Sequence, residues 1–284
     1  MKLHWKNIIL NAIGIGATIG LGIVFWLSTQ TPSATQPSTQ TSGTTSASLE
    51  FDSEELVYSG TGMLDLMEGV HAIDSDGTDL TDEVNAVITA DGTLTRKTVR
   101  YSVYGANGEV VTRQRSLLLQ NYTGPTLEIA QPLQFNSAEL PRLIDYLQEE
   151  DLLRAVDGYG MEITGQVTCV REHQGQQTYD LTFQVINQFQ DSVERTVSAT
   201  ITGEVNNPSI QLVTDETQIS VGTDFQPLAY VMSANDGSNG ANLDQIQIDS
   251  TVNPNQPGRY RVTYQLYSSD HTAKTTAVLQ VTVQ

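Results

Sequence analysis

The sequence predicts an all-β fold of tandem β-sandwich domains, preceded by one N-terminal transmembrane helix and a disordered linker. The first observation is an alternating strand pattern at residues 99–104, which recurs at residues 181–186 and 262–267. The second is a different motif at residues 72–84, which reappears at residues 155–167. Both motifs return after about 80 residues, and two unlike motifs with one period indicate duplicated domains rather than short solenoid repeats.

The first element in chain order is an apolar segment at residues 8–27 without a charged side chain. As a helix it would reach roughly 30 Å, the thickness of the hydrocarbon core of a membrane. Lys2 and Lys6 precede it, so the positive-inside rule places residues 1–7 in the cytoplasm and the C-terminal domains outside the cell. A cleaved signal peptide is the alternative, although it usually has a shorter apolar core and an A-x-A-like cleavage site. We expect a retained signal anchor that crosses the cell membrane once.

Residues 28–48 form the next element, which is built almost entirely of Ser, Thr, Gln, Pro, Gly and Ala. Such a segment cannot bury enough apolar surface to offset the entropy that folding costs. As a flexible coil it would span about 25 Å. We therefore expect a disordered linker that separates the membrane from the folded domains.

The remaining chain divides into three domains, at residues 49–121, 125–204 and 207–284. In each, apolar and polar residues alternate in short runs that Gly-, Asn- and Asp-rich turns separate, which is typical of half-buried antiparallel strands. Several short strands with frequent turns in about 80 residues favour a β-sandwich. Pro-containing polar joints at residues 121–125 and 206–208 mark the boundaries, where we expect proteases to cut first.

Two finer features follow from the same patterns. An apolar stripe of helical period predicts one helix at residues 138–155, as a short helical insertion in the second domain. In the repeated strand, Tyr101, Phe183 and Tyr264 take equivalent positions, and each is flanked two residues away by an aliphatic side chain. Because alternate strand residues share a face, these three aromatic residues are predicted to lie in three equivalent cores.

The repeated motifs also resemble those of a known family. Residues 72–81 look like the early-strand signature of bacterial Ig-like repeat domains, and residues 257–264, followed by Asp270, look like their late-strand signature. Such domains occur in tandem on Gram-positive surface proteins. The second domain departs from the pattern, because it lacks the Asp-x-Asp-Gly turn of the first. The resemblance implies Ig-like sandwiches with a surface role, and no enzymatic activity that belongs to the fold itself.

The amino-acid composition restricts the kinds of molecule that the protein can bind. The chain has 14 basic and 33 acidic residues and a formal charge of −19. Proteins that bind nucleic acid need a basic surface, so this charge excludes nucleic acid as a partner. Cys169 is the only cysteine, so no disulfide can form within the chain. It lies in the alternating run of residues 163–169, where we expect it to act as a small buried hydrophobic residue.

Catalytic and cofactor-binding motifs are missing from the sequence. It contains no G-x-S-x-G, P-loop or H-E-x-x-H motif. His71, His173 and His271 fall one in each domain, so they form no local metal cluster in the sequence. We therefore assign no catalytic, cofactor-binding or metal-ligating residue and expect a protein that is not an enzyme.

Asp74, Asp76 and Asp79 are the best candidates for a cation site. Loops rich in carboxylates suit calcium. However, Gly77 does not stand where the glycine of an EF-hand loop is required, and Asp and Gly are also the residues that a tight turn needs. The sequence favours the turn and leaves calcium binding as the alternative.

These features predict a membrane-tethered extracellular surface protein without enzymatic activity. It would serve as a structural stalk or as an adhesion module for a protein or glycan ligand. The alternative is an accessory or sensing subunit of a cell-envelope complex, with the activity supplied by a partner. An exposed aromatic patch would favour ligand binding, and a patch-free acidic surface would favour a spacer.

Overall fold

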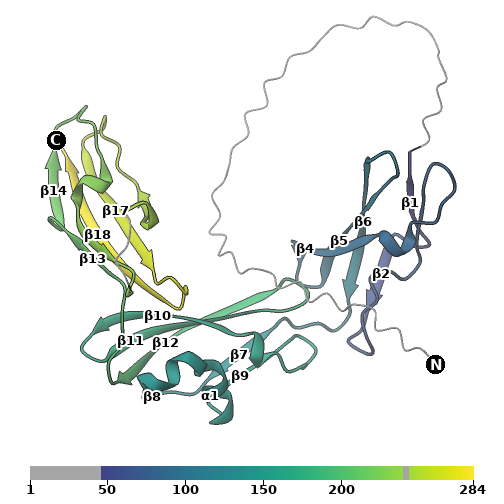
Figure 1. The fold of residues 1–284 in the computed structure, drawn as a ribbon, viewed down its shortest axis with the longest axis horizontal. Helices are drawn as coiled ribbons and strands as arrows, with labels where there is room; N and C mark the ends of the chain where they lie inside the picture. Colours follow the sequence, from purple (N-terminus) through teal and green to yellow (C-terminus); the bar gives the residue numbers. More distant parts are fainter. Residues whose placement is uncertain (1–45, 239–242) are drawn as a thin grey trace, which may run out of the picture. The chain divides into compact units, whose positions relative to one another are not determined.

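The structure is a computed structural model that describes residues 46–238 and 243–284. The described residues fold mostly as β-strands, which confirms the all-β prediction for this part of the chain (Figure 1). None of their helices is long and apolar enough to cross a membrane. The predicted membrane span at residues 8–27, together with nearly all of the predicted linker, lies outside the described residues.

The strands form three similar units of six strands each. The first unit contains β1 to β6, the second β7 to β12 and the third β13 to β18. The strands of the first unit are β1 (Ser48–Phe51), β2 (Glu55–Tyr58), β3 (Val70–Ile73), β4 (Asn85–Thr93), β5 (Arg96–Tyr104) and β6 (Val110–Leu119). Those of the second are β7 (Thr126–Ile129), β8 (Leu133–Asn136), β9 (Leu153–Val156), β10 (Thr168–Gly175), β11 (Thr178–Ile186) and β12 (Ser192–Thr202). Those of the third are β13 (Ser209–Leu212), β14 (Glu216–Ile219), β15 (Val231–Asn235), β16 (Gln247–Ser250), β17 (Gly258–Tyr267) and β18 (Ala273–Val283).

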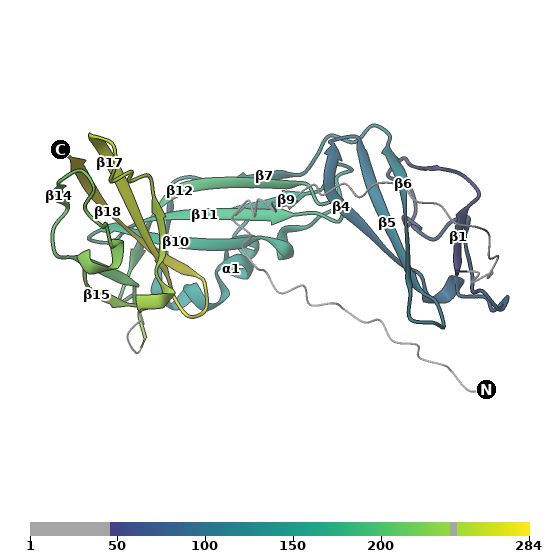
Figure 2. The same ribbon diagram turned by 90° about the horizontal axis from the view of Figure 1, so that it is seen from above.

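Each unit repeats one topology. A two-stranded sheet joins the first and third strands, as in β1–β3, β7–β9 and β13–β15. A four-stranded sheet contains the other strands, in the orders β2-β6-β5-β4, β8-β12-β11-β10 and β14-β18-β17-β16. The second strand of a unit pairs in parallel with the last, and the other pairs in these sheets are antiparallel. A short parallel pairing of β10 with β18 joins the larger sheets of the second and third units (Figure 2).

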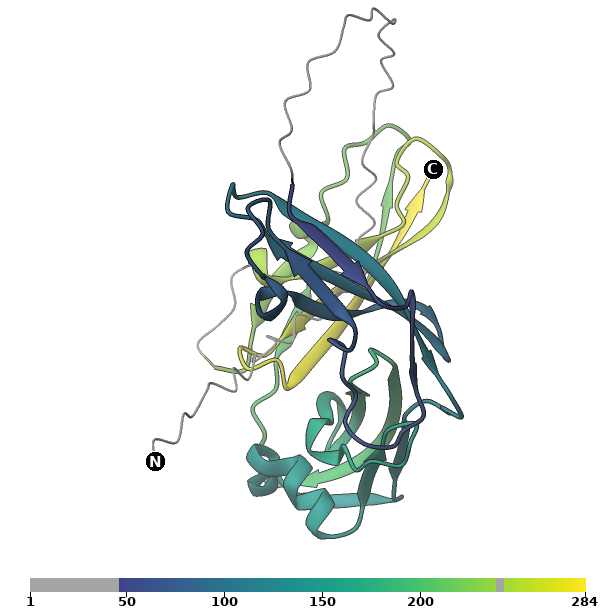
Figure 3. The same ribbon diagram turned by 90° about the vertical axis from the view of Figure 1, so that its right-hand side faces the viewer.

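The helices are short connections. A single 3₁₀ turn precedes the fourth strand of each unit, at η1 (Thr81–Glu83), η3 (Thr164–Gln166) and η5 (Leu243–Gln245). The third unit adds η4 (Pro227–Tyr230), and the second unit adds η2 (Ser137–Arg142) followed by α1 (Leu143–Glu149). In Figure 3 the helices of the second unit, in teal, lie beside the strands of the same unit.

The predicted helix at residues 138–155 is correct in place but wrong in extent. Pro141 has no backbone N–H to donate, and the chain up to Arg142 is a 3₁₀ helix rather than an α-helix. At the other end, Asp151 has a φ of 57°, a left-handed conformation that ends the helix. Leu153 and Ala155 then belong to β9, where alternate residues are buried. The apolar stripe therefore changes period from helix to strand within one run.

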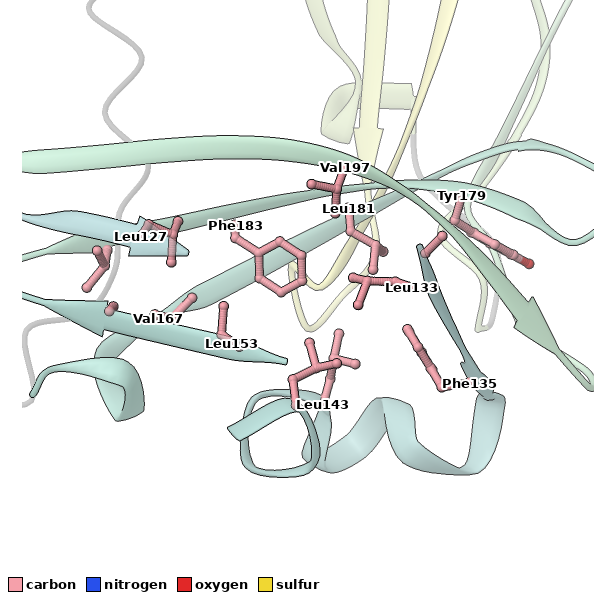
Figure 4. Packing of buried hydrophobic residues seen from close by; sticks show 14 of the residues in the cluster. Leu127, Leu133, Phe135, Leu143, Leu153, Val167, Tyr179, Leu181, Phe183 and Val197 are labelled. Atoms are coloured by element: carbon pink, nitrogen blue, oxygen red, sulfur yellow. The ribbon is translucent and has the colours of Figure 1, made fainter. Parts of the chain in front are cut away.

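Three clusters of buried hydrophobic residues fill the sandwiches. Tyr101, Phe183 and Tyr264 have no exposed surface, which confirms their predicted equivalence as core residues. Figure 4 shows Phe183 in the second unit, surrounded by aliphatic side chains from facing strands and from α1. Burial of such residues is the main stabilising contribution in each unit. The cluster of the first unit also contains Phe189, which belongs to the second unit.

Candidate functional site

Asp74, Asp76 and Asp79, the candidates for a cation site, accept hydrogen bonds from backbone N–H groups. Asp76 and Asp79 each accept a hydrogen bond of 2.9 Å from the N–H two residues further on, at Thr78 and Thr81. Asp74 accepts one of 3.0 Å from the N–H of Ala106, in the turn between β5 and β6. Hydrogen bonds from the two threonines hold the pKa of Asp76 and of Asp79 below the usual value. The three carboxylates thus shape turns.

The other titratable side chains of interest lie apart from one another. Across the described part of the chain, no group of three or more His, Cys, Asp and Glu residues is arranged to hold a metal ion. His71 is 59% exposed and its Nε2 lies 3.1 Å from Oδ1 of Asp52. Cys169 packs against the core of the second unit, and burial raises the pKa of its thiol to about 12. A thiol with so high a pKa is a poor nucleophile.

The side chains that do converge lie where the first unit meets the second. Lys97 is on β5 of the first unit, and Asp191 is in the turn between β11 and β12 of the second. The Lys97 Nζ lies 2.5 Å from the Asp191 Oδ1. The two side chains are only 3% and 17% exposed. A buried lysine is rare without a partner of opposite charge, so this ion pair ties the two units together.

The turn that carries Asp191 is built around Asn187. The side-chain oxygen of Asn187 accepts hydrogen bonds of 3.0 Å from the N–H of Phe189 and 3.1 Å from that of Asp191. Gln190 takes a left-handed conformation with a φ of 64°. Together these features place Phe189 in the core of the first unit, where it has no exposed surface, and Asp191 beside the lysine.

Tyr122, in the connection between the units, completes the polar contacts. Its hydroxyl donates a hydrogen bond of 2.9 Å to Oδ2 of Asp191. The same hydroxyl oxygen accepts one of 2.5 Å from Nδ2 of Asn187. Burial raises the pKa of Tyr122 above its usual value, and the charge of Asp191 raises it further. The phenol therefore stays protonated and keeps its role as a donor to the carboxylate.

Four aromatic rings surround this polar centre. Tyr58 belongs to the first unit, Tyr122 to the connection, and Tyr159 and Phe189 to the second unit. Five pairs of these rings have centroids between 5.1 and 6.0 Å apart. The hydroxyl of Tyr159 also donates a hydrogen bond of 3.1 Å to the backbone oxygen of Tyr58. We call this group, with Lys97, Asn187 and Asp191, the aromatic joint.

Two glycines allow the rings to pack so closely. A Cβ atom on Gly158 would lie 2.2 Å from Cε2 of Tyr122 and 2.5 Å from the backbone nitrogen of Gly124. A Cβ atom on Gly60 would lie 2.2 Å from Cδ1 of Tyr159. A side chain at Gly158 would have to displace the ring of Tyr122, and one at Gly60 the ring of Tyr159.

The aromatic joint has almost no signature in the sequence. The pattern at residues 121–125 predicts a polar boundary open to proteases, whereas Tyr122 is only 4% exposed. One signal was present in the sequence. In the alternation of β5, Lys97 shares a face with Val99 and Tyr101, so a charged residue stands at a core position. The acceptor could not be inferred, because Asp191 is distant in sequence and belongs to another unit.

Two grooves on the described residues are lined without aromatic side chains. One groove, of about 330 Å³, lies over β4, β5 and β6 and includes Arg96, which is paired with Glu55. The other, of about 510 Å³, lies over β14, β17 and β18 and includes Glu216 and Arg259. Neither is lined by an aromatic residue. Of the large hydrophobic side chains that are exposed in the described residues, Tyr104 is the only aromatic one.

Comparison with solved structures gives distant similarities. The CBM51-2 domain in complex with GlcNAc and the INT domains of ZmpB from Clostridium perfringens are 21% identical to 30% of this chain, with a TM-score of 0.23. This chain spans only 20% of that one. A protocadherin gamma B4 extracellular domain is 14% identical, over 83% of this chain and 49% of that one, with a TM-score of 0.19. A lipoprotein from Bacteroides thetaiotaomicron is 10% identical, over 82% and 98% of the two chains, with a TM-score of 0.21.

Comparison with protein families gives a match in the third unit. No curated protein matches the chain. Residues 210–283 match the family model described as bacterial surface protein, Ig-like domain. This range begins within β13 and runs to the end of β18, so it contains almost the whole unit. The match agrees with the resemblance that the strand motifs indicate, and the third unit of this chain is similar to bacterial surface Ig-like domains.

Proposed function

We propose that this protein is a membrane-tethered extracellular spacer of tandem Ig-like units, which holds its C-terminal unit away from the cell surface. The observation that carries the proposal is the aromatic joint, in which a core residue of the first unit is supplied by the second. Such a joint resists bending between the units, which a spacer requires. The surface Ig-like family of the third unit and the apolar segment at residues 8–27 support an extracellular location behind a membrane anchor.

The exposed surface favours a spacer over an adhesion module. Sites for glycans and for proteins usually present aromatic or contiguous apolar side chains. The exposed large apolar side chains of the described residues are almost all aliphatic, and neither groove is lined by an aromatic residue. The charge of −19 keeps the surface soluble and repels other acidic surfaces. An accessory subunit of an envelope complex is the second candidate, because residues 8–27 could pack against a partner helix through Gly16 and Gly20.

One purification distinguishes a spacer from an accessory subunit and from an adhesion module. The whole chain, with a C-terminal affinity tag, is extracted from membranes in mild detergent. For a spacer we expect no envelope protein to co-purify in a stoichiometric amount. The matched control has residues 8–27 replaced by an unrelated membrane span. A stoichiometric partner that is lost in the control would favour the accessory subunit, and a partner retained in both would favour an adhesion module.

A further inference from the structure

The two joints between units differ in chemistry. In the aromatic joint, Phe189 has no exposed surface and lies in the same cluster as Tyr58 and Leu119 of the first unit. The ion pair of Lys97 and Asp191 is almost completely shielded from water. Because one unit completes the core of the other, separating the units would open that core and leave two buried charges without partners.

The joint between the second and third units is polar instead. The backbone N–H of Arg171 on β10 donates a hydrogen bond of 3.0 Å to the oxygen of Thr272, just before β18. The guanidinium of Arg171 donates to Oγ1 of Thr272 at 2.9 Å and to the backbone oxygen of Asn206 at 3.3 Å. Lys274 pairs with Glu172 at 3.4 Å, and these side chains are 25% and 22% exposed. We call these contacts the polar joint.

No hydrophobic cluster of the described residues spans the polar joint. The buried cluster of the third unit contains only residues of that unit, so no core residue of the second unit completes it. The ladder between β10 and β18 has two residue pairs. Nε of Arg171 is buried and has no hydrogen-bond partner. Water can replace hydrogen bonds of this kind, and salt screens partly exposed ion pairs.

We propose that the chain has one fixed joint and one joint that opens. The first and second units fold and unfold as a single body, whereas the third unit is a separate body that moves about the polar joint. This goes beyond the proposed function, since it would hold for a spacer and for a ligand-binding protein alike. On a cell surface, it would give a stiff base and a terminal Ig-like unit that reorients.

Calorimetry of the whole protein in detergent micelles tests the first half of the proposal. Two unfolding transitions are expected. The variants Tyr101→Ala and Phe183→Ala, in the cores of the first and second units, should both lower the same transition. Tyr264→Ala, in the core of the third unit, should lower only the other one. Three transitions, or a single transition that all three variants lower, would overturn the proposal.

Hydrogen exchange measured by mass spectrometry tests the second half and needs no core variant. When the salt concentration is raised from about 0.05 M to 1 M, exchange at the N–H of Arg171 should quicken at least about tenfold. Exchange at the N–H groups of Phe189 and Asp191, in the aromatic joint, should stay unchanged. The variant Arg171→Gln should quicken exchange at position 171 already at low salt, whereas Arg154→Gln, an exposed arginine elsewhere on the second unit, should not. Equal salt dependence at both joints, or none at either, would contradict an opening polar joint.

Discussion

Lys97 stands where the other units have an aromatic residue. It lies two residues before Val99 on β5, and the equivalent positions on β11 and β17 are Tyr179 and Tyr260. An inward-facing lysine has a large desolvation cost, which only a well-placed opposite charge offsets. Asp191 of the neighbouring unit provides that charge, so one substitution in a repeated strand creates a dependence between two units.

Substitution of Lys97 should lower the stability of the protein far more than substitution of the adjacent Arg96. Lys97→Met leaves the Asp191 carboxylate in the aromatic joint without its cation, which should lower the free energy of unfolding by about 3–5 kcal/mol. Arg96→Met is the matched control, because Arg96 also pairs with an acid, Glu55, but is half exposed. Its loss should cost about 0–1 kcal/mol. Denaturant unfolding of both variants measures the difference, and equal effects would mean that Lys97 is not shielded.

Asp270 makes the stability of the third unit depend on pH in the acid range. Burial raises the pKa of this carboxyl, but hydrogen bonds from Ser268 and Thr272 outweigh it, so the folded pKa lies below the ordinary value of 3.8. A lowered folded pKa contributes stability at pH values above the unfolded pKa, and this contribution is lost as the pH falls through the folded pKa.

We therefore expect the unfolding transition of the third unit to fall in temperature as the pH is lowered below about 4. The variant Asp270→Asn should remove part of that fall while leaving the transition of the first two units unchanged. Calorimetry between pH 7 and 3 provides the measurement. An unaltered pH profile in the variant would show that other carboxyls dominate.

At the scale of elements, strands were predictable because their alternation is local. The three aromatic core residues could be placed from the pattern of their own strands, since burial of alternate residues determines the face on which they lie. The helix was predicted too long, because its apolar stripe continues into β9, where the same residue types serve a different period. The aromatic joint depends on contacts between residues far apart in sequence, such as Tyr58 and Tyr159, which no local pattern contains.

The connection at Gly158 provides a test of close packing in that joint. Gly158→Ala places a methyl group against Tyr122 and the backbone of Gly124, so we expect a loss of about 1–3 kcal/mol in stability. Gly165→Ala, in η3 of the same unit, is the matched control, because a Cβ atom there meets nothing within 4 Å. That variant should be neutral or more stable by about 0.4–1 kcal/mol. Chemical unfolding measures the stability of both variants. Equal free energies of unfolding would contradict the close packing at Gly158.

At the scale of the molecule, the repeat predicts much of the architecture and little of the function. A motif that returns after about 80 residues indicates three units, because each sandwich needs that length to close its own core. What the repeat does not contain is the difference between units. The aromatic joint and the polar joint use different residues at their contacts, among them Lys97 in the first and Arg171 in the second.

The central claim, an extracellular spacer held by a retained anchor, is tested most directly by adding a protease to intact cells that carry the protein with a C-terminal epitope. We expect the epitope to be removed without lysis, while a membrane-bound fragment that still contains residues 1–27 remains and is identified by its mass. An epitope that stays protected until the cells are opened would contradict the account. So would a mature chain that begins near residue 35 and is recovered from the soluble fraction.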